Sequence, residues 1–272
     1  MIFETHIPAF PLNQFIESFI YYRDYNPAHS IDRLLPDGNI TIIIDLTDHP
    51  RFIYDNNTLK EIQTCRHVWF SGIRNKPISI PSGRDSEMLI IQFHKGKSYP
   101  FISMPLHELA DSVVDGELVL TNEILRLREK LLYILTPFQK FLFLEKQLLK
   151  IYRKNLVDNP FVNYAVSKIV HAPNSASIHQ ISDKVGYSQK HFIKIFREHV
   201  GLTPKDFLKV IRFQKAIYEI ERYQKITWTN ISYDCGYYDQ SHFIADFKTF
   251  SGFTPNQYLK MRGNFTNYVA VG

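Results

Sequence analysis

Residues 181–209 read ISDKVGYSQKHFIKIFREHVGLTPKDFLK, and residues 231–260 read ISYDCGYYDQSHFIADFKTFSGFTPNQYLK. Both segments follow one pattern of Ile-Ser, Gly-Tyr, His-Phe, Phe, Gly-x-Thr-Pro and Leu-Lys. The offset between the copies is 50 positions up to the Gly-Tyr pair and 51 positions from the His-Phe pair onward, so the second copy has one more residue in its turn. Glycine and proline are among the matched positions, which makes a chance match very improbable. One supersecondary unit therefore occurs twice in this chain.

Each copy contains the signals of two short helices joined by a tight turn. Capping residues precede the four helices: Ser177, Ser188, Thr227 and Asp239. Gly186 and Gly236 end the first helix of each copy, because glycine tolerates the positive φ that a sharp turn requires. Two short helices joined by a glycine-containing turn form a helix-turn-helix. The chain is therefore predicted to hold two such units, the first unit and the second unit.

A longer helix is predicted between the two units. Thr203-Pro204 supplies a cap and a first-turn proline, and Thr254-Pro255 repeats this signal after the second unit. Apolar residues recur at helical spacing from Pro204 to about Tyr223: Phe207, Leu208, Ile211, Ala216 and Ile220. About 20 residues at ~1.5 Å each give a rod of roughly 30 Å. Two reading helices held by such a rod can enter successive major grooves, which repeat every ~34 Å.

These motifs resemble those of a known family. Residues 160–262 are similar to the DNA-binding domain of the AraC/XylS family of transcription regulators, which carries two helix-turn-helix units joined by a long helix. Ser182 and Ser232 depart from the family pattern, which usually has alanine there, but both residues are small. The resemblance implies a sequence-specific regulator, more often an activator, with double-stranded DNA and RNA polymerase as partners. A helical bundle without DNA-binding activity is the alternative.

The excess positive charge of the chain lies in the same half. The whole chain has a net charge of +5. Residues 155–272 hold 14 Lys+Arg and 9 Asp+Glu, whereas residues 1–154 hold 18 of each. This distribution is typical of a surface that faces DNA phosphates. An imbalance of five charges also arises on surfaces that have no such partner, so the charge only supports the motif.

The second helix of each unit is predicted to read DNA. The residues expected to face bases are Gln189, Lys190, Ile193, Lys194, Gln240, Ser241 and Ile244. The residues expected to contact phosphates are Ser188, Arg197 and Lys248. Ala245 stands where the family often has arginine, and Asp246 would be repelled by phosphate unless it turns away. The first unit should therefore supply most of the sequence discrimination and the second unit mostly docking; plain solvated helix faces are the alternative.

Two histidines of the repeat are interpreted separately. His191 and His242 each precede a core phenylalanine. This placement favours packing or a phosphate contact over base reading.

The N-terminal half is predicted to be a different module. A short, aromatic, helix-like stretch covers residues 15–22. Apolar, β-branched runs bounded by turn residues follow at residues 40–46, 68–73, 78–80 and 88–93. Short strands at this spacing predict a small antiparallel sandwich or barrel. Residues 34–38 and 101–109 resemble cupin-like sensing domains that precede AraC-type DNA-binding domains, so the predicted fold class is α+β with two domains.

Catalytic and metal-binding patterns are sparse in this half. Enzymatic cupins cluster histidines as His-x-His with a nearby Glu, whereas four histidines here are scattered: His49, His67, His94 and His107. The sequence has no nucleophile elbow, phosphate-binding glycine loop or paired-carboxylate motif, so no enzyme, metal or cofactor is predicted. A catalytic or metal-binding cupin fused to a DNA-binding module is one alternative. An architectural DNA-binding protein with an inert N-terminal domain is another.

A small-molecule effector is a predicted partner of the N-terminal half. The aromatic and arginine residues expected to line its pocket are Tyr21, Tyr22, Tyr25, Arg33, Trp69 and Arg84. An aromatic cluster of this kind is also the pattern of a plain barrel core.

Two amphipathic helices are predicted between the modules, at residues 122–135 and 138–152, with Thr136-Pro137 between them. They either form a homodimer contact or merely close the barrel. The polar run at residues 150–159 places a short, semi-rigid joint near residues 154–159, so the predicted domains are residues 1–154 and 155–272.

Compartment signals point to the cytoplasm and to no membrane contact. Cys65 and Cys235 are the two cysteines, and Cys235 is expected inside the second unit, so no disulfide framework is implied. No segment has the pattern of a signal peptide or reaches ~18 consecutive apolar residues. The sequence thus predicts a transcription regulator whose N-terminal sensor shifts the population of DNA-reading arrangements.

Overall fold

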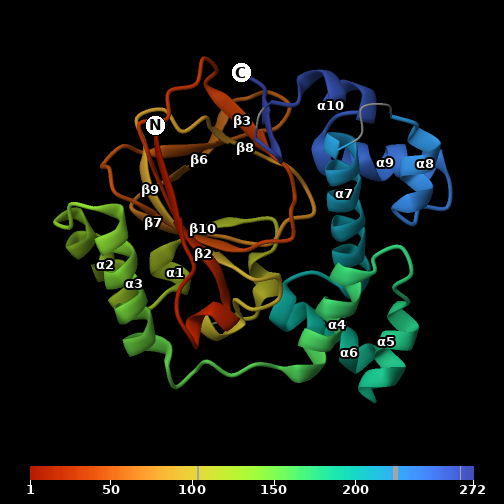
Figure 1. Ribbon diagram of the computed structural model, residues 1–272, viewed down its shortest axis with the longest axis horizontal. Helices are drawn as coiled ribbons and strands as arrows, with labels where there is room; N and C mark the ends of the chain where they lie inside the picture. The colour runs from red at the N-terminus through yellow and green to blue at the C-terminus, as the bar shows by residue number, and fades with distance from the viewer. Residues whose placement is uncertain (103, 223–225, 264) are drawn as a thin grey trace.

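Two antiparallel sheets pack face to face in the N-terminal half of the computed structural model, which describes residues 1–102, 104–222, 226–263 and 265–272 (Figure 1). One sheet has the strand order β1 (Ile2–His6), β2 (Ile16–Arg23), β9 (Glu87–Phe93), β4 (Thr41–Asp45), β7 (Val68–Ser71) and β10 (Val113–Asp115). The other has the order β11 (Tyr268–Ala270), β3 (Ile31–Leu34), β8 (Ile78–Pro81), β5 (Arg51–Tyr54) and β6 (Glu61–Cys65). The predicted antiparallel fold is confirmed as a sandwich, not a closed barrel.

The central strands of the six-stranded sheet are apolar on both faces. On β4, Ile42 and Ile44 join the large core that continues into the helices, whereas Ile43 points toward the second sheet. Strand β9 alternates in the same way, with Leu89 in the large core and Met88 between the sheets. A strand that is buried on both faces has a continuous apolar sequence, which is why these two strands stand out in the chain.

The helix-like stretch expected at residues 15–22 is wrong, because this segment forms strand β2 between β1 and β9. The register with β9 shifts between Ile16 and Ser18, so the strand carries a bulge. Ile16 and Phe19 therefore point into the same core at an interval of three residues. An interval of three resembles a helical period in the sequence, and this is the reason for the error.

The remaining strands are ones that the apolar pattern did not predict: β1, β3, β5, β6, β10 and β11. They are short or lie at a sheet edge, and the first four residues of β6 are exposed. Their positions depend on pairing with distant strands, and such pairing leaves little trace in a local sequence window.

Two helices follow the sandwich and cover one side of it, as Figure 1 shows. Helix α2 (Asn122–Leu132) ends earlier than predicted, and α3 (Pro137–Tyr152) begins at the predicted proline after the cap Thr136. The turn between them is closed by the buried Lys140, whose Nζ donates to the carbonyls of Leu131 at 2.7 Å and Ile134 at 2.6 Å. The shorter helices of this half are η1 (Leu12–Gln14), η2 (Tyr99–Phe101), η3 (Leu106–Leu109) and α1 (Gly116–Val119).

The C-terminal half is helical and contains both predicted units. The first unit is α5 (Ile178–Val185) with α6 (Gln189–Val200), and the second unit is α8 (Trp228–Asp234) with α9 (Gln240–Ser251). Helix α7 (Pro204–Arg222) joins them, α4 (Pro160–His171) precedes them, and α10 (Pro255–Met261) follows. The predicted end of the long helix, near Tyr223, lies outside the described residues. Within the part of the chain that is described, no helix has the length and hydropathy needed to cross a bilayer.

Local capping explains where these helices begin and end. The side chains of Ser177, Ser188 and Asp239 accept hydrogen bonds from first-turn backbone amides at 3.3, 3.3 and 2.7 Å. Thr227 also precedes its helix in an extended conformation, but its side chain makes no capping hydrogen bond. Gly186 ends α5 with φ at +76°, as predicted for this turn.

The end of the chain returns to the N-terminal half. Strand β11 pairs with β3, and the backbone N–H of Leu35 donates to the carbonyl of Asn267 at 2.9 Å. The side chain of Val269 is fully buried there. Residues beyond the predicted joint near residues 154–159 thus add an edge strand to the sandwich, and this strand ties the second unit to it.

Replacing Val269 with aspartate should detach this tail, because the new carboxylate would be buried without a partner. We expect V269D to lower the free energy of unfolding by at least about 2 kcal/mol. Ala270→Asp, on the exposed face of the same strand, is the matched control and should change it by less than about 0.5 kcal/mol. Urea unfolding followed by circular dichroism measures both, and equal losses would contradict the role of the buried face.

Candidate nucleic-acid interface

Helix α6 presents a polar and basic face to solvent. The side chains of Gln189, Lys190, Lys194 and Arg197 are exposed, and Ile193 is half-buried. Five predicted DNA contacts therefore lie on the outer side of one helix, over about two turns. Ser188 is exposed as well, but its Oγ is already engaged as the helix cap.

Phenylalanines fix the inner face of both reading helices. In the first unit, Phe192 and Phe196 are buried, and Phe196 packs against Phe207 of α7 with the ring centroids 5.7 Å apart. In the second unit, Phe247 packs against Phe213 of α7 at 5.2 Å. One helix therefore anchors both reading helices, and it does so through the matching positions of the repeat.

The repeated histidines pack against the repeated tyrosines. His191 meets Tyr187 edge to face at a centroid distance of 4.7 Å, and His242 meets Tyr237 in the same way at 5.6 Å. Of the two roles expected for these histidines, the structure shows packing. In both units this contact holds the loop between the two helices against the start of the reading helix.

Helix α9 is less basic and more constrained than α6. Ser241 and Lys248 are exposed, whereas Gln240 and Ile244 are half-buried. The hydroxyl of Thr229 on α8 donates to Oε1 of Gln240 at 3.1 Å, which orients this side chain.

The carboxylate of Asp246 turns away from the exposed face of α9. Its side chain is buried, Nζ of Lys209 on α7 lies 3.2 Å from Oδ1, and Nε2 of His242 lies 3.7 Å from Oδ2. The negative charge is thus neutralised inside the domain, and it does not oppose a phosphate at the reading face. The sequence predicted only that Asp246 must turn away from a phosphate. It could not identify Lys209 as the partner, because this lysine lies on another helix.

Helix α7 sets the separation of the two units. Its 19 residues span about 28 Å at ~1.5 Å per residue. Figure 1 shows the first unit packed at one end of this helix and the second unit beside the other end. This length matches the predicted rod.

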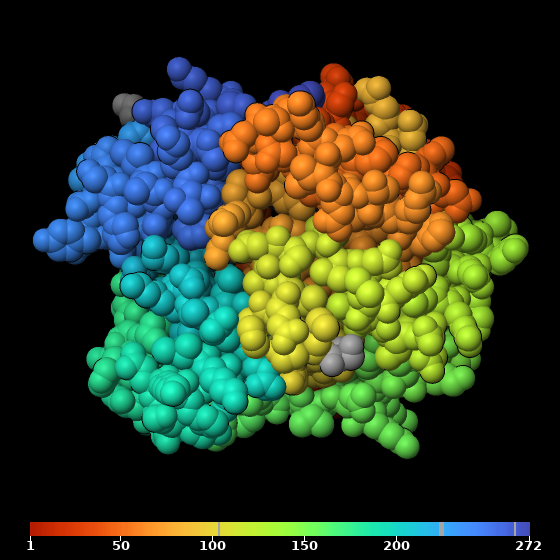
Figure 2. Space-filling view, turned by 180° about the vertical axis from the view of Figure 1, so that it is seen from behind, coloured from red at the N-terminus to blue at the C-terminus, as the bar shows by residue number. Residues whose placement is uncertain are grey.

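The N-terminal half braces the first unit directly. Helix η3 packs against α6, and the hydroxyl of Tyr99 donates to Glu198 at 3.0 Å. The ring of Tyr99 also lies 4.0 Å from that of His199, and burial lowers the pKa of this histidine below its usual value. Figure 2 shows the two surfaces in contact, with the yellow segment of η2 and η3 against the cyan first unit.

The second unit is braced by different contacts. The guanidinium of Arg33 on β3 lies over the ring of Phe253 at 5.1 Å. Nε2 of Gln214 on α7 donates to the carbonyl of Pro36 at 2.7 Å and to Oδ1 of Asn267 at 2.8 Å. Together with β11, these contacts hold the second unit and the long helix against the sandwich.

The residues predicted to line an effector pocket lie in different surroundings. Tyr21 belongs to the large core, where its hydroxyl donates to Glu87 at 2.8 Å. Tyr22 and Trp69 both belong to the cluster between the two sheets, but on strands β2 and β7, which β9 and β4 separate. Adjacent residues of a strand point to opposite faces, so Tyr21 and Tyr22 do not face one cavity.

The other predicted pocket residues face outward or toward the helical half. Arg33 contacts the second unit, as described above, and Arg84 is exposed and donates to the carbonyl of Pro27 at 2.9 Å. The ring of Tyr25 meets that of Phe265 edge to face at 5.6 Å. Of the predicted set, Tyr22 and Trp69 are thus the two that lie between the sheets.

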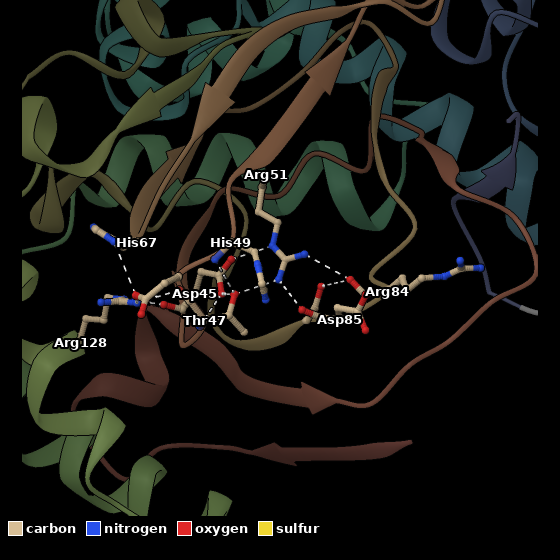
Figure 3. A network of polar contacts seen from close by, with 10 residues as sticks. Asp45, Thr47, His49, Arg51, His67, Arg84, Asp85 and Arg128 are labelled. Carbon is tan, nitrogen blue, oxygen red and sulfur yellow. Dashed lines mark hydrogen bonds and ion pairs between the residues drawn. The ribbon is translucent and has the colours of Figure 1, made fainter.

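A buried polar network, which the sequence did not indicate, lies at one end of the sandwich (Figure 3). Nε of Arg51 donates to the fully buried Asp45 at 2.8 Å. Arg128 of α2 donates to the carbonyls of Asp45 and Thr47 and to Oδ1 of Asp48, each at 2.7 Å. These groups satisfy one another, so the network fastens α2 to the sheet.

No candidate metal centre emerges from the described part of the chain. Among residues 1–102, 104–222, 226–263 and 265–272, no three His, Cys, Asp or Glu side chains are grouped as a metal ion requires. The histidines at positions 49 and 67 lie beside the polar network of Figure 3, whose carboxylates are paired with arginines.

The fold and the paired reading helices define a class of protein, those with a double helix-turn-helix domain. A family model described as a helix-turn-helix domain matches residues 181–261, and a domain of unknown function, DUF6597, matches residues 4–115. The helical half of the chain thus contains a helix-turn-helix domain similar to that of the AraC/XylS family of transcription regulators, and the predicted resemblance is confirmed.

Curated relatives match the chain over part of its length. An uncharacterized HTH-type transcriptional regulator of Haemophilus influenzae is 32% identical over 100 residues, which are 36% of this chain and 33% of the relative. The HTH-type transcriptional activator RhaS of Escherichia fergusonii is 29% identical over 87 residues, 32% of this chain and 31% of the relative. The match thus spans about a third of each relative.

A solved structure resembles the chain over nearly its whole length. ToxT from Vibrio cholerae aligns over 96% of this chain and 98% of its own, at 14% identity and a TM-score of 0.47.

Two glycines with positive φ give a matched test of the contact between the sandwich and the first unit. A Cβ on Gly201 would meet Cγ2 of Ile73 at 2.5 Å and the carbonyl of Leu106 at 3.2 Å, whereas a Cβ on Gly186 would meet no atom within 4 Å. Both alanine variants should lose about 1–2 kcal/mol of stability from backbone strain. G201A should lose roughly a further 1–3 kcal/mol from overpacking. Urea unfolding compares them, and equal losses would show that this contact tolerates the added methyl group.

Proposed function

We propose that this protein is a sequence-specific DNA-binding transcription regulator that reads two neighbouring segments on one face of a duplex. The observation that carries this proposal is the exposed face of α6, on which Lys190, Lys194 and Arg197 project while Phe192 and Phe196 anchor the other side. A second helix of the same design lies beside the other end of α7. This duplication supports a site of two blocks in successive major grooves.

The two units are proposed to make different contributions to DNA binding. On α6, Gln189 and Lys190 suit adenine and guanine edges, Ile193 suits a thymine methyl group, and Lys194 suits a guanine. On α9, Gln240, Ser241 and Ile244 are proposed to contact bases, but with fewer cations around them. We therefore assign most of the sequence discrimination to the first unit and most of the docking to the second. Arg197, Lys248 and the cap Ser188 are the proposed phosphate contacts.

The N-terminal half is proposed to act as a sensor. A small-molecule effector or a dimer contact would favour one arrangement of the two halves and so change the affinity for DNA. Within the earlier pocket prediction, Tyr22 and Trp69 between the sheets are the residues we retain for an effector. No cofactor or catalytic step is part of this proposal.

A homodimer is proposed through the hairpin of α2 and α3. Its surface carries exposed apolar side chains: Leu132, Tyr133, Leu135, Phe138 and Leu142. As an activator, the protein would also contact RNA polymerase, and it would act in the cytoplasm, where its operator lies.

The proposed function is tested by selecting bound fragments from random DNA and footprinting the selected site. We expect a protected, sequence-defined stretch that spans two neighbouring major grooves on one face. Uniform protection without a selected motif would instead indicate an architectural DNA-binding protein.

Replacing Lys194 with alanine should relax the selected sequence within one half of the site, because its ammonium group is proposed to read a base. The expected cost on the preferred site is roughly 1–3 kcal/mol of binding free energy. Repeating the selection with K194A measures the change. Lys60→Ala, an exposed lysine of the sandwich, is the matched control. An unchanged motif for K194A would remove Lys194 from the base-reading set.

Replacing Arg197 with alanine should weaken binding to all sequences alike, because a phosphate contact carries no sequence information. The slope of log affinity against log salt should fall in magnitude by about one. Fluorescence anisotropy with the selected site and with an unrelated duplex, at several salt concentrations, measures both quantities. A loss confined to the selected site would make Arg197 a base reader.

A further inference from the structure

The second unit differs from the first by one inserted residue, and the structure identifies it. Tyr187 and Tyr237 both pack against the repeated histidine, and Ser188 and Asp239 both cap the reading helix. Tyr238 therefore has no counterpart in the first unit. It stands immediately before the cap of α9, and its side chain is 94% exposed.

The backbone on both sides of Tyr238 is held firmly. The preceding Tyr237 is buried, and its ring meets that of Phe243 at 5.3 Å. The following Asp239 caps α9 by accepting from the backbone N–H of His242 at 2.7 Å. An exposed side chain on such a fixed turn loses little backbone freedom when it meets a partner.

The reading helix behind Tyr238 is short of cations. The sequence of α6 contains Lys190, Lys194 and Arg197, whereas that of α9 contains Lys248 as its single Lys or Arg. A helix-turn-helix that docks on DNA with so few cations needs other phosphate contacts, and tyrosine hydroxyls are among the groups that supply them.

A second exposed tyrosine lies on the other helix of this unit. Tyr233, on α8, is 81% exposed. The first helix of a helix-turn-helix crosses the DNA backbone, so a phenol there faces the same kind of partner. The matching position of the first unit is Asp183, which is paired with His179 at 2.8 Å. The second unit thus carries exposed phenols at two positions, Tyr233 and Tyr238, at which the first unit has Asp183 and no residue, respectively.

Resting on the proposed DNA-binding function, we propose that Tyr238 is a docking residue of the second unit, whose hydroxyl donates a hydrogen bond to a phosphate oxygen of the duplex backbone. Because the phenol is neutral, this contact adds affinity without releasing a counterion. The two units then differ in chemistry: the first binds the backbone through ionic contacts, and the second binds it largely through neutral ones.

The test uses the full chain with Tyr238→Phe, which keeps the ring and removes the hydroxyl. Affinity for the selected site and for an unrelated duplex is measured by fluorescence anisotropy over a range of salt concentrations. We expect Y238F to bind about threefold to tenfold more weakly on both duplexes, with the salt slope unchanged. Lys248→Ala should instead reduce the magnitude of that slope by about one.

Controls separate this inference from the proposed function. Tyr54→Phe, at a half-buried tyrosine of strand β5 in the sandwich, should bind as the unaltered protein does. If the unaltered protein binds DNA and Y238F matches it at every salt concentration, the Tyr238 contact is overturned while the DNA-binding function stands. A change of salt slope with Y238F also overturns it. If the unaltered protein selects no sequence, both conclusions fail together.

Discussion

The burial of one helix on several sides is the constraint on which the rest of this structure depends. Nine side chains of α7 are buried, and the helix contacts the first unit, the second unit and, through Gln214, the segment that follows β3 of the sandwich. Each fully buried phenylalanine, leucine, isoleucine or valine among them contributes about 1.5–3 kcal/mol to stability, more than an exposed ion pair does. Phe207 of this helix packs against Phe196 of α6, and Phe213 packs against Phe247 of α9. The spacing of the readers follows from where these rings stand on α7.

The helical half could be predicted because its signals are local. Much of the sandwich could not, because its strands depend on pairing between distant segments. Caps such as Ser188 and turn glycines such as Gly186 act within a few residues, so the sequence alone places them. The bulge in β2 and the pairing of β11 with β3 depend on segments far away in the chain. The same holds for Arg128, whose acceptor, the carbonyl of Asp45, lies 83 positions away. Spacing rules contain no information on such contacts.

The candidate interface shows the same division at the level of single residues. Helical spacing was enough to predict that Lys190 and Lys194 share an exposed face. It could not show that Asp246 pairs with Lys209, because that requires the crossing of α9 with α7. The predicted pocket failed to assemble as one set for a simpler reason. Composition grouped Tyr21 with Tyr22, but neighbours on a strand face opposite ways.

The contacts between the halves suggest how a sensor could act on the readers. The first unit is held at Gly201, where a single added carbon would already collide with the sandwich, so this junction has little room to move. The second unit is held through β3, which carries Arg33 under Phe253 and pairs with β11. A ligand changes DNA affinity only by binding one arrangement better than another. A shift of β3 within its sheet would move both attachments of the second unit together and leave the first in place. Regulation by this route would have to alter the packing of Phe247 on Phe213 of α7, because this packing fixes the second reading helix relative to the first.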